Sequence, residues 1–166
     1  NSFLAEAMSD VPAVRVATFH SFALGVIREY LATHMQDESC RACFFNCVGE
    51  IAANFMPGKK KPEGDAAKDL DSRLSGALFV IRDLPAESMC RGFVDGHGGD
   101  LPDAVRSVMG FLLPDGGSDF YSDRIPLALM SVFESDPGLR ARHSYDALII
   151  DEAQDPVYVY ICHKYA

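Results

Sequence analysis

The chain has 166 residues, of which 48% are hydrophobic and 23% charged, and its formal net charge is −9. This composition is typical of a globular domain and excludes wholesale disorder, while the negative charge provides no overall basic field for nucleic acid. No apolar run approaches the roughly 18–20 residues that a membrane span requires, and no secretory signal pattern is present. The five cysteines then favour free thiols in a reducing compartment. We expect a protein of the cytoplasm, or of the nucleus in a eukaryote, without a membrane partner.

The residue pattern at the start of the chain predicts the end of a helix, a short β-strand and a second helix. Residues 1–9 have the pattern of the end of an amphipathic helix, and Pro12 interrupts it. Residues 14–19, VRVATF, alternate in side-chain type as a short β-strand does. From His20 onward, with a start near Ser21, helical spacing predicts a buried stripe of Phe22, Ala23, Val26, Ile27, Tyr30 and Leu31.

The middle of the chain predicts mainly helices, at about 38–55, 66–83, 86–95, 101–113 and 118–135. Between them, Pro, Gly and polar residues predict loops at 56–65, 95–100 and 114–117. Pro126 predicts a kink in the last of these helices, and Asp136-Pro137-Gly138 predicts its end.

A polar pentapeptide follows an apolar run at residues 145–155, YDALIIDEAQD. Such a run is typical of a strand buried on both faces of a parallel sheet, here expected at 146–150. The functional edge of such a sheet lies just beyond the carboxyl ends of its strands. Asp151 and Glu152 would lie at that edge, where carboxylates suit hydrated Mg²⁺. The alternative is an acidic, solvated turn.

The stretch TFHSF at 18–22 predicts a strand end that turns into a helix. The free N–H groups of a helix start suit a phosphate, and Thr18, His20 and Ser21 could add side-chain donors. An exposed aromatic ring there could stack on a base. The alternative is that Phe19 and Phe22 belong to the core and that Ser21 caps the helix.

Together the two stretches resemble two motifs of the superfamily 1 DNA helicases of the UvrD/Rep type, in the same order along the chain. The matching segments are VATFHSFA at 16–23 and YDALIIDEAQD, with its Walker B strand, at 145–155. The resemblance implies an α/β fold, a partial RecA-like P-loop NTPase domain with a large helical insertion. It places residues 1–22 and 141–166 in the ATPase core and residues 23–140 in a helical inserted subdomain.

The resemblance also implies roles for individual residues. Asp151 and Glu152 would face the Mg²⁺ of MgATP, and Glu152 would be the catalytic base for the attacking water. Gln154 would lie near the γ-phosphate and couple hydrolysis to movement. The path of single-stranded DNA would follow Thr18, Phe19 and His20. The implied cofactors are ATP and Mg²⁺, and the implied partners are single-stranded DNA or a single/double-strand junction and the remaining helicase domains of the parent chain.

The sequence departs from the family in what it lacks. No GxxxxGK[ST] phosphate loop occurs among the 166 residues, nor do the later arginine motifs. We therefore expect a segment of an ATP-dependent DNA helicase that does not hydrolyse ATP by itself. One alternative is a truncated or degenerate module that binds DNA or a partner protein without ATPase activity. Another is a metal-dependent nuclease that uses the acidic cluster at 151–155.

Three cysteines, Cys40, Cys43 and Cys47, follow His34 at spacings that include CxxC, a known zinc-ligand pattern. No second CxxC pair completes such a site. Because the same spacing defines one face of a helix, the thiols are also expected as small hydrophobic groups of a core.

Overall fold

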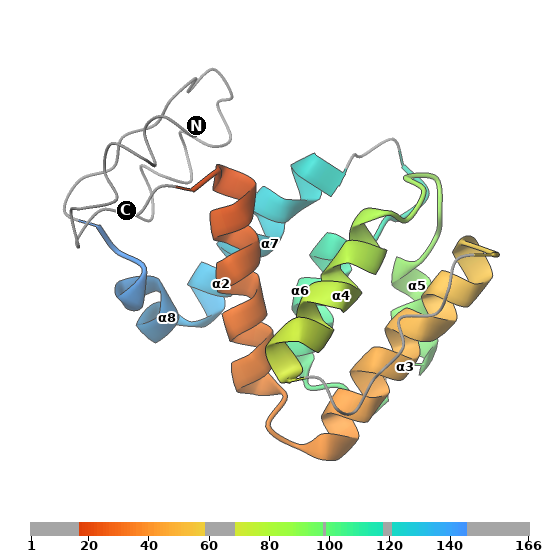
Figure 1. Cartoon of the computed structure of the whole chain (residues 1–166), viewed down its shortest axis with the longest axis horizontal. Helices are drawn as coiled ribbons and strands as arrows, with labels where there is room; N and C mark the ends of the chain where they lie inside the picture. Colours follow the sequence, from red (N-terminus) through yellow and green to blue (C-terminus); the bar gives the residue numbers. More distant parts are fainter. Residues whose placement is uncertain (1–16, 59–68, 98, 118–120, 146–166) are drawn as a thin grey trace.

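The computed structural model describes residues 17–58, 69–97, 99–117 and 121–145, which contain seven α-helices and no β-strand (Figure 1). Extended pairing in this part is limited to an isolated antiparallel bridge between Met89 and Asp115. The expected α/β fold, a partial RecA-like domain, is therefore wrong, because the described body is built from helices packed on helices. The strand expected at 146–150 and the elements expected before residue 17 lie outside the described residues.

The first described helix, α2 (Phe19–His34), begins where the sequence predicts the end of a strand. Thr18 has an extended backbone, with φ −69° and ψ 152°, but it serves as the N-cap of α2. The alternation that indicated a strand thus ends in a capping residue, and Phe19 is already helical. The predicted stripe is confirmed at Ala23, Val26, Ile27, Tyr30 and Leu31, which are buried, whereas Phe22 is partly buried.

Helix α3 (Glu38–Phe55) has the bounds that the sequence predicts, with Asp37 as its N-cap. Helix α4 (Leu70–Arg82) lies within the predicted 66–83 and is capped by Asp69. The aspartate side chains accept hydrogen bonds from the N–H groups of Ser39 and Ser72, at 3.0 and 2.9 Å. Both helix starts therefore follow from local sequence.

The next helix, α5 (Arg91–His97), begins later than the predicted 86–95 and continues through residues expected in a loop. Residues 88–90 instead pair with residues 114–116, in the connection between α6 and α7. The Cys90 N–H donates to Pro114 O at 3.1 Å, and the Gly116 N–H donates to Ser88 O at 3.0 Å. This pairing joins positions far apart in the sequence, so helical periodicity could not reveal it.

Helices α6 (Asp103–Leu112) and α7 (Tyr121–Ser135) agree with the sequence prediction, and Pro126 lies inside α7. The short helix α8 (Pro137–Arg142) was not expected, since Asp136-Pro137-Gly138 indicated only the end of α7. Asp136 accepts a hydrogen bond from the Leu139 N–H at 2.8 Å, and proline occupies the first turn, where it needs no N–H partner. The same residues thus end one helix and begin another.

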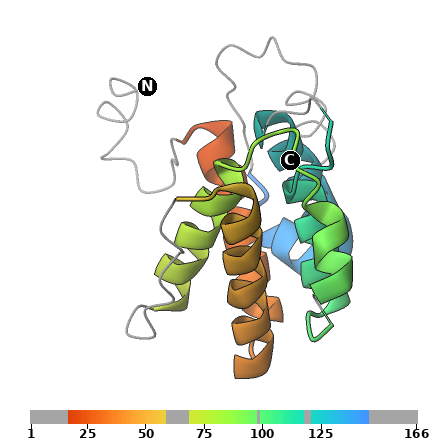
Figure 2. The ribbon, with the colours of Figure 1, turned by 90° about the vertical axis from the view of Figure 1, so that its right-hand side faces the viewer.

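The core of the body is formed mainly by α2, α6 and α7, with α7 packed against both of the others (Figure 1). Helix α4 contacts both α2 and α3. Helix α3 lies on the side of the body away from α7 (Figure 2). Tyr30, Phe44, Leu74, Met109 and Ile125 are among the large side chains that are essentially inaccessible to water. They come from five helices, which makes the core continuous across the described part of the chain.

Arginine side chains close several helix ends by donating to free carbonyl groups. The Arg124 side chain, on a residue that is 4% exposed, donates from Nη1 to Leu112 O at 2.8 Å, at the C-terminus of α6. The Arg41 Nε donates to Met35 O at 2.6 Å across the turn from α2 to α3. Such contacts satisfy carbonyls that have no partner within their own helix.

Candidate functional site

The predicted site residues fall into two groups. Asp151, Glu152 and Gln154, expected to hold MgATP and its attacking water, lie outside the described residues. Thr18, Phe19 and His20, expected on the DNA path, lie at the start of α2. The described part of the site is therefore the N-terminal end of α2, together with the residues that pack against this helix.

Thr18 is exposed and closes the first turn of α2. Its Oγ1 accepts a hydrogen bond from the Ser21 N–H at 3.1 Å and donates to Ser21 Oγ at 2.8 Å. The capping role that the sequence suggested for Ser21 thus belongs to Thr18. Both hydroxyl groups remain at the surface, where a phosphate could reach them.

The two aromatic residues after Thr18 are partly buried. Phe19 packs against the core, and its ring lies edge-on to the His20 ring with 6.1 Å between centroids. Phe22, one turn further, also packs against the core. These contacts favour the structural interpretation of the phenylalanines, while Thr18, His20 and Ser21 remain the polar groups of the turn.

A charged contact ties the end of the described chain to α2. Glu29 Oε1 accepts from Arg142 Nη2 at 3.0 Å and from Arg142 Nε at 3.2 Å, while its Oε2 lies 2.9 Å from His143 Nε2. An ionised carboxylate only accepts hydrogen bonds, so His143 Nε2 carries the proton in this contact. The hydrogen bond with His143, opposed by partial burial and aided by Arg142, lowers the pKa of Glu29. We name Glu29, Arg142 and His143 the clasp.

Aromatic contacts extend the clasp toward the start of α2. The Phe22 ring lies edge-on to the His143 ring, with 5.9 Å between centroids, and to the Tyr145 ring, with 6.2 Å. Tyr145 is the last described residue, two positions before the apolar run Ala147–Ile150 that leads to Asp151 in the sequence. The chain that enters the helical body near Thr18 and the chain that leaves it at Tyr145 are therefore neighbours.

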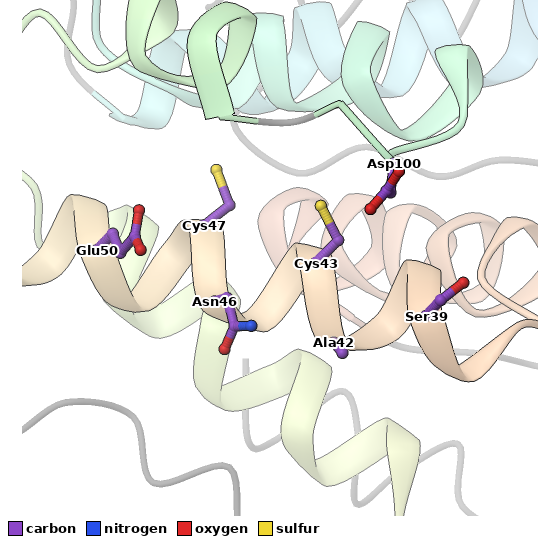
Figure 3. A pocket seen from close by; sticks show the side chains of 7 residues that line it. All are labelled: Ser39, Ala42, Cys43, Asn46, Cys47, Glu50 and Asp100. Carbon is purple, nitrogen blue, oxygen red and sulfur yellow. The ribbon is translucent and has the colours of Figure 1, made fainter.

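A shallow hollow of about 390 Å³ lies on another side, between α3 and the loop before α6 (Figure 3). Cys43 and Cys47 point into it from α3, with Glu50 further along the helix and Asp100 across from Cys43. Burial, aided by the nearby Cys43 and Glu50, raises the pKa of the Cys47 thiol to about 11. Cys47 is therefore protonated at neutral pH, and a protonated thiol is a poor nucleophile.

The described residues contain neither a metal-binding cluster nor a helix that could span a membrane. No group of three or more His, Cys, Asp or Glu side chains is arranged there to hold a metal ion, and this includes the cysteines of α3. Nor does the described part contain a helix long and apolar enough to cross a membrane.

The clasp is the feature that the sequence did not indicate. Neither His143 nor Glu29 belongs to a motif in the sequence, and Glu29 lies between buried positions of α2. The two are 114 positions apart, and no motif or periodicity connects them. Only the return of α8 to α2 brings them together.

Comparison with known proteins gives no match to any family model, curated protein or solved structure.

Proposed function

We propose that this chain is a segment of an ATP-dependent DNA helicase of the superfamily 1 type. Its described helices would form a helical body between the segment that contacts DNA and the segment that binds MgATP. The parent protein would couple ATP hydrolysis to translocation on single-stranded DNA and to duplex unwinding. Such work belongs to the cytoplasm, or to the nucleus of a eukaryote.

The observation that carries the proposal is the meeting of the two ends of the body. An element inserted between two parts of another domain must begin and end near one place, because its host has to continue across the gap. Here Phe22, directly after the TFHS turn, contacts both His143 and Tyr145, and Tyr145 lies six positions before Asp151 in the sequence. The two motifs that resemble helicase motifs therefore flank a body whose entry and exit adjoin.

The chemistry of the proposal rests on the acidic segment. Asp151 would bind the Mg²⁺ of MgATP, and Glu152 would polarise the water that attacks the γ-phosphate, with Gln154 beside that phosphate. On the other segment, the Thr18 and Ser21 hydroxyl groups and the first N–H groups of α2 would contact the DNA backbone. The phosphate loop that cradles ATP would come from the parent protein.

The test is DNA-stimulated ATP hydrolysis by the parent protein and by its Glu152→Gln variant. Loss of a general base lowers turnover by about 10²–10⁴-fold, whereas MgATP binding should persist because Asp151 is retained. Glu87→Gln, at an exposed loop glutamate, is the matched control and should keep full activity. Equal turnover of the Glu152→Gln variant and the wild type would contradict the role of Glu152.

A second function, binding without hydrolysis, is favoured by one sequence feature, since no GxxxxGK[ST] loop occurs in these 166 residues. Such a module would bind single-stranded DNA or a partner protein without turning over ATP. The same assay separates the two, because DNA binding with no ATPase activity in the wild-type parent protein identifies the binding module. Metal-dependent DNA cleavage that is lost in the Glu152→Gln variant would instead indicate a nuclease.

A further inference from the structure

The clasp holds the outgoing chain along α2 over a defined length. Phe22 and Glu29 are seven positions apart, so they lie on one side of α2, about 10 Å apart along its axis at 1.5 Å per residue. The outgoing chain contacts Glu29 at Arg142 and His143, and Phe22 at His143 and Tyr145. The chain therefore runs back along α2, toward the end at which Thr18 lies.

The ion pair between Arg142 and Glu29 contributes little to holding the core together. The Arg142 and Glu29 side chains are 56% and 40% exposed, and exposed ion pairs each contribute only about 0–1 kcal/mol to stability. The core of α2, α6 and α7 is formed by apolar side chains that do not include the clasp residues. The three polar contacts of the Glu29 carboxylate thus mainly set the direction in which the chain leaves α8, and they add little to the stability of the helical body.

We propose that Glu29 is a positioning residue that couples the helical body to the segment carrying Asp151 and Glu152. This inference rests on the proposed function. By holding Arg142 and His143 together, Glu29 fixes the direction in which the chain leaves α8, and this direction would relate α2 to the acidic segment that follows in the sequence. A strand of DNA bound near Thr18 would act on α2, and the clasp would transmit that action to the site of ATP hydrolysis.

The experiment compares the wild-type parent protein with Glu29→Gln, which keeps the shape of the side chain but removes its charge. The matched control is Glu50→Gln, an exposed glutamate on α3. ATP turnover is measured with and without single-stranded DNA, next to thermal unfolding. We expect Glu29→Gln to retain basal turnover and to lose at least about fivefold of the stimulation by DNA, a typical size for coupling between two sites. The control should keep both.

Arg142→Gln provides an independent variant, because it removes two donors from Glu29 while leaving the carboxylate in place. We expect the same loss of stimulation, and the double variant should lose no more than either single one, since all three break one contact. Additive losses, or full stimulation in folded Glu29→Gln and Arg142→Gln proteins, would overturn the positioning role. If Glu29→Gln does not fold, Arg142→Gln decides alone.

The outcomes for the two proposals are distinguishable. Absence of DNA-stimulated turnover in the wild-type protein refutes the proposed function, and the coupling role falls with it. Normal turnover in the wild type with unaltered stimulation in both clasp variants refutes the coupling role alone.

Discussion

At the scale of single residues, the clasp shows how one carboxylate can organise two chain segments. Glu29 is charged and partly exposed, which by itself indicates only a solvated helix face. Its significance comes from having both carboxylate oxygens bound by Arg142 and His143, at the C-terminal end of α8. Because these partners donate to the charged form, they lower the pKa of the Glu29 carboxyl.

This lowered pKa predicts how stability depends on pH. The unfolded chain has the ordinary glutamate pKa of about 4.5, above that of the folded state, so the stabilising contribution of Glu29 is complete above that pH. It is lost as the pH falls below about 4.5 and through the lowered pKa. The measurement is urea unfolding of wild type and Glu29→Gln at neutral and acidic pH. The difference in unfolding free energy between them should shrink on acidification, and a constant difference would contradict the assignment.

At the scale of elements, most helices follow from their own sequences. Apolar residues at helical spacing predicted α2, α3, α6 and α7, and aspartate caps set the starts of α3 and α4. Two elements differed from the prediction for different reasons. Pairing of Ser88 and Cys90 with Gly116 and Pro114, far along the chain, delays the start of α5, whereas a local cap by Asp136 allows α8 to form directly after α7.

The start of α2 provides a test at this scale. Thr18→Ala removes the oxygen that accepts from the Ser21 N–H and should cost about 1 kcal/mol of unfolding free energy. Thr18→Ser keeps that oxygen and should be close to wild type. Chemical denaturation of the three proteins measures the difference. Equal losses in the alanine and serine variants would show that the Thr18 methyl group, rather than its hydroxyl, supports the helix.

At the scale of the whole molecule, the described helices share one core, and the first and last of them lie next to each other. Core residues come from every helix from α2 to α8, and the entry and exit of the body adjoin at Phe22, His143 and Tyr145. A unit with its own apolar core and adjoining ends has what an independently folding insertion requires.

We therefore expect residues 17–145, expressed alone, to fold into a helical unit that unfolds in one cooperative transition. Its unfolding free energy should be in the range of about 5–15 kcal/mol that is usual for single domains. Circular dichroism during denaturation measures the helical signal, and tyrosine fluorescence reports on the core around Tyr30. Coincident transitions are expected. Separate transitions would show that the body depends on segments beyond it.

By itself, the sequence determined that the middle of the chain is helical and which side chains of α2 face the core. Helical periodicity and caps act over a few residues, so they can be read locally. The tertiary structure alone decided that Phe19 and Phe22 pack against the core, and that Glu29 meets Arg142 and His143. Those outcomes depend on packing between residues far apart along the chain, which neither propensity nor spacing records.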